Sequence, residues 1–141
     1  MGNAKKNLKF MSDLILIFLT CSFIRTILEV FMTDIKVNNI SAEFMIVAKI
    51  ILCLIYVVIF LPQIYVGVKG IKMSKNPDSS KAHIIWAVIF VAFAVFSAVS
   101  AVANMINNKD MTGNIFRLID AVIDFVLYFF YVKYAKQVLV A

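Results

Sequence analysis

Charged residues are scarce in this sequence of 141 residues, where Asp, Glu, Lys and Arg together make up only 16%. A soluble domain carries about 25% charged and about 45–50% apolar residues, whereas this chain is 63% hydrophobic. A chain of this length buries only about two-thirds of its surface on folding, so the extra apolar side chains have no core to fill. The scarcity of charge therefore argues against a soluble domain and indicates lipid as the solvent.

Cysteine and histidine are nearly absent, which limits the chemistry open to the chain. Cys21 and Cys53 both lie in apolar stretches, and neither a CxxC pair nor a Cys/His ligand spacing occurs. We therefore expect no metal site and no disulfide framework. The one histidine, His83, precedes an apolar stretch near Trp86, where we expect an interfacial anchor. Since no nucleophile–base spacing is recognisable, we predict no catalytic residue, no cofactor and no enzyme activity.

Four long apolar stretches are present, at about residues 14–32, 44–68, 84–106 and 115–132. Each has the length of about 17–25 residues that a helix needs to cross hydrocarbon. Their apolar residues are continuous and do not alternate, which excludes a barrel reading. The sequence therefore predicts an all-α fold: an integral membrane four-helix transmembrane bundle, with residues 1–141 as one multi-pass domain in the plasma membrane and the lipid bilayer as a partner.

Lysine is distributed unevenly about these stretches. Only Lys36 and Lys109 lie in the first and third joints, against nine lysines in the N-terminus, the middle joint with its flanks and the C-terminus. Positively charged loops stay in the cytoplasm, so both termini and the middle joint are predicted to be cytoplasmic. The net charge of +6 is explained by this bias. Because no basic helix or aromatic platform lies outside the stretches, we expect no nucleic-acid partner.

The joints are predicted at Asp34–Ser41, Gly70–Lys81 and Asn107–Asn114, which are rich in residues that break helices. Pro62 falls inside the second stretch, where it should kink the helix. The third stretch has small residues at helical spacing on one face. They are Ala94, Ser97, Ala98 and Ala101. We expect this face to contact another helix of the bundle, with a homodimer contact as the alternative.

Six ionisable residues lie inside the stretches, where a charge costs about 2.5–3.5 kcal/mol on insertion scales. They are Arg25, Glu29, Lys49, Arg117, Asp120 and Asp124. Together with Asn104 they are the candidate ligand- or ion-binding residues, and all fall in the predicted outer half. The balance of three positive and three negative charges slightly favours a polar network that locks the four helices into one register over a cavity that binds an ion, a proton or a small charged solute. Arg25–Glu29 and Arg117–Asp120 can pair within their own helices. Asp124 has no cation one turn away, so we expect it to pair with Lys49 in preference to Arg25, bind a proton or cation, or face water.

Two short segments resemble known families. Pro62-Gln63-Ile64-Tyr65 resembles the Pro-Gln start of a PQ-loop transporter, but the second half of that repeat is missing and three helices would be usual there. The stretch from Gly67 to Lys72, followed by Lys75-Asn76-Pro77 and Lys81-Ala82, resembles small four-span membrane proteins of Gram-positive bacteria that are uncharacterised. That resemblance implies the four-span architecture and a bacterial plasma membrane, and it implies no activity.

These observations leave the function open between three classes. The first is an accessory or interaction subunit with a polar cavity in the outer half of the bundle, working with another membrane protein or a second copy of itself. The alternative is a minimal transporter, or a membrane protein that binds an ion or a proton with its buried charges. Carriers are usually built from repeats and no repeat is visible here, which favours the first class. A membrane enzyme is the third.

Overall fold

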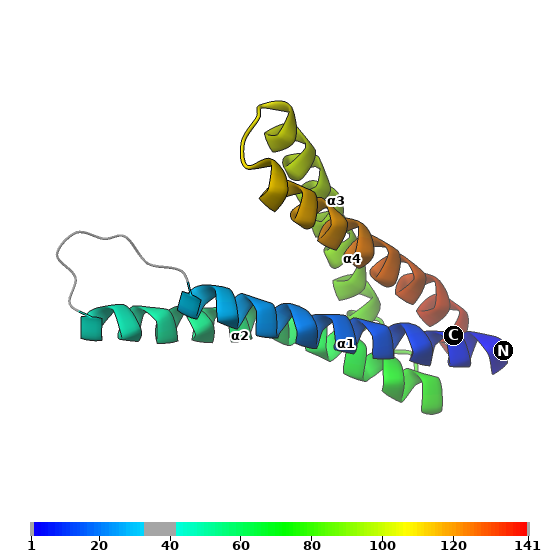
Figure 1. The fold of residues 1–141 in the computed structure, drawn as a ribbon. Helices are drawn as coiled ribbons and strands as arrows, with labels where there is room; N and C mark the ends of the chain where they lie inside the picture. The colour runs from blue at the N-terminus through cyan, green and yellow to red at the C-terminus, as the bar shows by residue number, and fades with distance from the viewer. Residues whose placement is uncertain (1, 33–41, 141) are drawn as a thin grey trace.

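The computed structural model describes residues 2–32 and 42–140, which form four α-helices (Figure 1). These are α1 (Gly2–Met32), α2 (Ala42–Lys75), α3 (Ala82–Ile106) and α4 (Met111–Val138). The described residues contain no strand, so the all-α prediction is confirmed for them. The predicted joint Asp34–Ser41, with Lys36, lies outside the described residues.

The helices extend beyond the apolar stretches that predicted them. Helix α1 already begins at Gly2, and α2 continues through Gly70 to Lys75, although Gly70 was predicted to open the middle joint. Lysine favours helices about as well as leucine, so the polar ends of the stretches do not stop them. Helix α2 ends just before Asn76-Pro77, because a residue that precedes proline is driven out of the α conformation.

Three of the four helices, α1, α2 and α3, are long and apolar enough to cross a membrane. The prediction of four equivalent spans is therefore only partly met. Helix α4 has the length, at 28 residues, but it carries five charged residues. They are Arg117, Asp120, Asp124, Lys133 and Lys136. Its status as a span thus depends on where these charges point.

The helices pair into two antiparallel hairpins that together form a V (Figure 1). Helix α1 packs along α2, and α3 packs along α4, while the contacts of α4 with α1 and of α3 with α2 are less extensive. The hairpins meet at the end that holds both termini, and they diverge toward the other end, where α1 and α3 end and α2 and α4 begin. We call these the closed end and the open end of the V.

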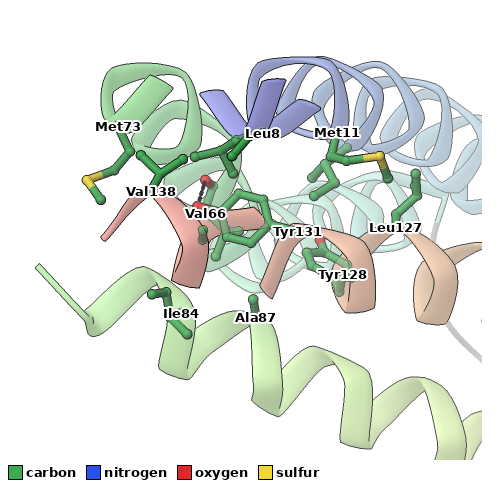
Figure 2. Packing of buried hydrophobic residues seen from close by; sticks show 13 residues of the cluster. Leu8, Met11, Val66, Met73, Ile84, Ala87, Leu127, Tyr128, Tyr131 and Val138 are labelled. Atoms are coloured by element: carbon green, nitrogen blue, oxygen red, sulfur yellow. Dashed lines mark hydrogen bonds between the residues drawn. The ribbon is translucent and has the colours of Figure 1, made fainter. Parts of the chain in front are cut away.

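The buried apolar core lies at the closed end (Figure 2). Leu8 of α1, Val66 and Met73 of α2, and Tyr131 of α4 are fully buried there. Figure 2 shows the Tyr131 hydroxyl directed at α2, where it donates a 3.0 Å hydrogen bond to the Val66 carbonyl oxygen. The core therefore joins the hairpins at one end and leaves their other ends apart.

Glycine allows the close approach of α1 to α2 at this end. A Cβ atom added at Gly67 would lie 2.5 Å from a methyl carbon of Leu16. One added at Gly70 would collide with the Ser12 hydroxyl and with the Tyr131 ring. The space that a side chain at position 70 would occupy is filled by side chains from α1 and α4. This close packing explains why a glycine is found inside helix α2.

The small-residue face of α3 is turned inward, as predicted. Ala101 is fully buried and Ala94 nearly so, while Ser97 and Ala98 are partly buried. Val99, on a neighbouring face, is 63% exposed. Since the most extensive packing of α3 is with α4, small side chains let these two helices run close together as a hairpin.

Candidate functional site

A cleft of about 920 Å³ lies between the two hairpins, and all four helices contribute to its walls. Five of the seven candidate residues identified in the sequence line it. They are Arg25, Glu29, Arg117, Asp120 and Asp124. Lys49 and Asn104 do not line it. The cleft exists because the core packs only the closed end of the V, and the residues on the facing sides of the hairpins are left uncovered.

Arg25 of α1 connects the hairpins across the cleft. Its Nη2 donates a 2.6 Å hydrogen bond to Oδ2 of Asp120 on α4. Its Nε also lies 3.9 Å from Oε1 of Glu29, one turn away on the same helix. Arg25 therefore serves two carboxylates. The Arg25–Glu29 contact was predicted from the i, i+4 spacing, whereas the shorter bond to Asp120 could not be read from spacing.

Arg117 does not form the predicted pair with Asp120 within α4. Its Nε instead donates a 3.2 Å hydrogen bond to the hydroxyl oxygen of Ser97 on α3. Asp120 is engaged by Arg25 of the other hairpin. The prediction was wrong because spacing along one helix does not show which groups the neighbouring helices bring close. Here α3 brings Ser97 to Arg117, and α1 brings Arg25 to Asp120.

Asp124 faces the cleft without a cation. No ion pair or hydrogen bond of its carboxylate is found among the described residues. The predicted partner, Lys49, is engaged elsewhere, since its Nζ donates a 3.0 Å hydrogen bond to the Phe31 carbonyl oxygen near the end of α1. The preferred pairing of Asp124 with Lys49 is therefore corrected. Asp124 also lines a second, smaller cavity of about 170 Å³ beside the cleft.

An aromatic wall continues the cleft from Asp124 toward the closed end. Trp86 and Phe90 of α3 are stacked with ring centroids 5.9 Å apart, and Phe90 lies 5.1 Å from the ring of Tyr128 on α4. The Tyr128 hydroxyl donates a 3.3 Å hydrogen bond to Oε1 of Gln63 on α2. Sequence reasoning missed these residues as part of a site. The available signal was the four-residue spacing of Trp86 to Phe90 and of Asp124 to Tyr128.

His83 is not an interfacial anchor, in contrast to the prediction. It is fully buried, with Nδ1 2.7 Å from the Tyr131 hydroxyl and Nε2 3.0 Å from the Ser80 carbonyl oxygen. Tyr131 lies 48 residues further along the chain, so local spacing could not reveal this partner. These two contacts of His83 connect α3 and the 76–81 loop to α4 at the closed end of the V.

The loop between α2 and α3 is fastened by Asp78. Its carboxylate accepts a 2.7 Å hydrogen bond from Lys69 Nζ and a 2.8 Å bond from the Ser80 backbone N–H. The Lys69 ammonium group, through this hydrogen bond, holds the pKa of Asp78 below its ordinary value, and the Ser80 bond adds to the effect. The Val140 N–H donates to the Asp78 carbonyl oxygen at 3.1 Å. The closed end is thus joined outside the core as well.

No group of three or more His, Cys, Asp or Glu side chains with the geometry of a metal site occurs in the described part of the chain. The side chains that line the cleft include charged and aromatic ones. No protein-family model, no curated protein and no solved structure matches this chain.

Proposed function

We propose that this protein is a small multi-pass membrane protein that binds a solute in the cleft between its hairpins, as a minimal binding or transport subunit. The observation that carries the proposal is Asp124, a carboxylate that faces an open cleft with no cation paired to it. A charge in an apolar segment is costly unless it has a partner, water or a ligand. Asp124 lacks a protein partner among the described residues, so a proton, water or a ligand is left to compensate it.

The whole bundle, including α4, is placed in the plasma membrane under this proposal. Three helices are apolar enough to cross it. The three charged residues in the first half of α4, Arg117, Asp120 and Asp124, line the cleft, so α4 can span without exposing them to lipid if the cleft holds water. The lysine bias then places both termini in the cytoplasm, and the cleft opens toward the outside.

The sequence favoured an accessory or interaction subunit over a binding protein, and this remains the second candidate function. Its support is the exposure of Arg25 and Glu29 in the apolar stretch of α1, where their side chains are 52% and 69% exposed. A helix from another membrane protein, or from a second copy of the chain, would cover them. A membrane enzyme gains no support from the described residues.

Trp86 offers a direct test, because it is the only tryptophan in the chain and it lines the cleft. The purified protein in lipid nanodiscs would be titrated with organic cations, organic anions and neutral solutes. We expect a saturable change in Trp86 fluorescence, with a rise in melting temperature, for at least one class. A protein that responds to none of the classes, and whose Trp86 emission shifts with the number of copies per nanodisc, would favour the subunit function instead.

A further inference from the structure

We propose that the solute of the cleft is a lipophilic monovalent organic cation, with its charged group at Asp124 and its apolar body against the aromatic wall. The inference rests on the proposed function, since it requires the cleft to bind a solute. It names the chemical class of that solute from three features of the cleft: its charge, the nature of its walls and its size.

The charges that line the cleft favour a single positive charge on the solute. Two arginines and three carboxylates line it, which leaves a formal excess of one negative charge. Arg25 is shared by Asp120 and Glu29, and Arg117 is bound to the neutral Ser97 hydroxyl, so Asp124 is the carboxylate of the cleft that has no cation paired with it. An anion could approach Arg117, but it would enter a cleft whose lining already carries a net negative charge. A monovalent cation, in contrast, balances the charge of the site.

The aromatic wall favours an organic cation over an inorganic one. Tyr128 follows Asp124 by one helical turn on α4. The ring of Phe90 on α3 lies against Tyr128, and the ring of Trp86 lies against Phe90. Aromatic faces attract cations that have shed part of their water, and they provide apolar surface for the rest of the molecule. A calcium ion would instead need about six to eight oxygen ligands, and the described residues hold no group of three or more His, Cys, Asp or Glu side chains placed for a metal.

The size of the cleft agrees with this class. Pockets for drug-sized molecules have volumes of about 300–1,000 Å³ and are lined mainly by apolar and aromatic side chains, with a few polar groups that set orientation. The cleft, at about 920 Å³, is large enough for a cation that carries several rings. The position of Asp124 next to the aromatic wall sets the orientation, with the ligand's rings toward the closed end.

The experiment uses two probes of matched shape and opposite charge, tetraphenylphosphonium and tetraphenylborate, titrated into the full-length protein in nanodiscs with Trp86 fluorescence as the readout. We expect saturable binding of tetraphenylphosphonium, with tetraphenylborate weaker by about tenfold or more. Asp124→Asn should weaken the cation by a similar factor, and Asp124→Glu should recover part of the loss. The matched control is Asp13→Asn, the same change on α1 outside the cleft, which should leave binding within about twofold.

Several results would overturn the inference. Equal or tighter binding of tetraphenylborate would assign an anion to the cleft and leave the solute-binding function standing. Cation binding that survives Asp124→Asn would remove Asp124 as the site, and the absence of saturable binding of either probe would reject the ligand class. If Asp124→Asn fails to fold, the comparison of the two probes on the unmodified protein decides the matter alone. Failure of the proposed function itself would be detected by a separate measurement. A cysteine placed in the cleft would then not react with a water-soluble thiol reagent.

Discussion

Arg25 of α1 and Asp120 of α4 are joined across the cleft by a hydrogen bond of 2.6 Å. The two residues are 95 positions apart in the chain and belong to different hairpins. The core joins these hairpins only at the closed end, so this pair connects them where apolar packing is missing. It is thus an ion pair that bridges the cleft between the two hairpins.

The first prediction concerns this pair. A double-mutant cycle of Arg25→Met and Asp120→Asn should give a coupling free energy of roughly 0.5–3 kcal/mol, the range for residues in direct contact. The measurement is unfolding in mixed micelles. The matched cycle of Arg117→Met with Asp120→Asn should couple by less, because Arg117 donates to Ser97. A larger coupling for Arg117 would restore the pairing within α4 that the sequence indicated.

The second prediction concerns the close approach at Gly70. Gly70→Ala should destabilise the protein by about 1–3 kcal/mol, the usual range for overpacking, although alanine favours a helix by up to about 1 kcal/mol over glycine. Ser12→Ala should recover part of the loss when it is combined with Gly70→Ala, because the Ser12 hydroxyl is the first obstacle to the added methyl group. A neutral or stabilising Gly70→Ala, measured by thermal unfolding, would show that α1 and α2 are further apart.

The third prediction tests the packing of α3 on α4. Ala101→Leu places a large side chain at a fully buried position, and it should cost about 1–3 kcal/mol. Val99→Leu is the control, because Val99 is 63% exposed and should accept the extra carbon with little change. If both variants have the melting temperature of the unmodified protein, the small-residue face does not contact a helix.

The fourth prediction concerns pH and the 76–81 loop. The pKa of Asp78 is lowered in the folded protein by Lys69 and the Ser80 N–H, so its contribution to stability is present above the ordinary pKa of 3.8. The contribution is lost as the pH falls through the lower, folded value. The melting temperature of the unmodified protein should therefore drop on acidification below about pH 4, and Asp78→Asn should flatten this part of the curve. Identical acid profiles would show that the Lys69–Asp78 bond is not formed in solution.

The sequence was sufficient to predict the elements of this fold. Continuous apolar stretches located all four helices, and the spacing of Ala94, Ser97, Ala98 and Ala101 predicted which face of α3 packs. These features depend on local periodicity, which a single sequence displays. The predicted helix ends were less accurate, because the lysines that flank the apolar stretches occur in helices as readily as in loops.

The partners of the polar residues could not be predicted in the same way. The charges that meet in the cleft were identified, but Asp120 was assigned to Arg117 and Asp124 to Lys49. The first assignment used spacing within α4 alone, and the second treated the helices as one closed bundle, in which depth decides which residues meet. The structure separates the hairpins, so the angle between them decides instead. That angle depends on contacts such as Tyr131 with Val66 and His83, which join residues far apart in the chain.

The most direct test of the account is whether water reaches the inner surface of the V. Two single-cysteine variants would be made with Cys21 and Cys53 replaced by alanine: Ser97→Cys in the cleft, and Val99→Cys on the exposed face of α3 that the account places in lipid. Each would be treated in intact cells with an impermeant, water-soluble thiol reagent. The account predicts that the cysteine at position 97 is modified and the one at position 99 is protected. A third variant, Ser79→Cys in the 76–81 loop, should also be protected, because the account places this loop in the cytoplasm. Protection at position 97 equal to that at position 99 would contradict the hydrated cleft and the binding function built on it.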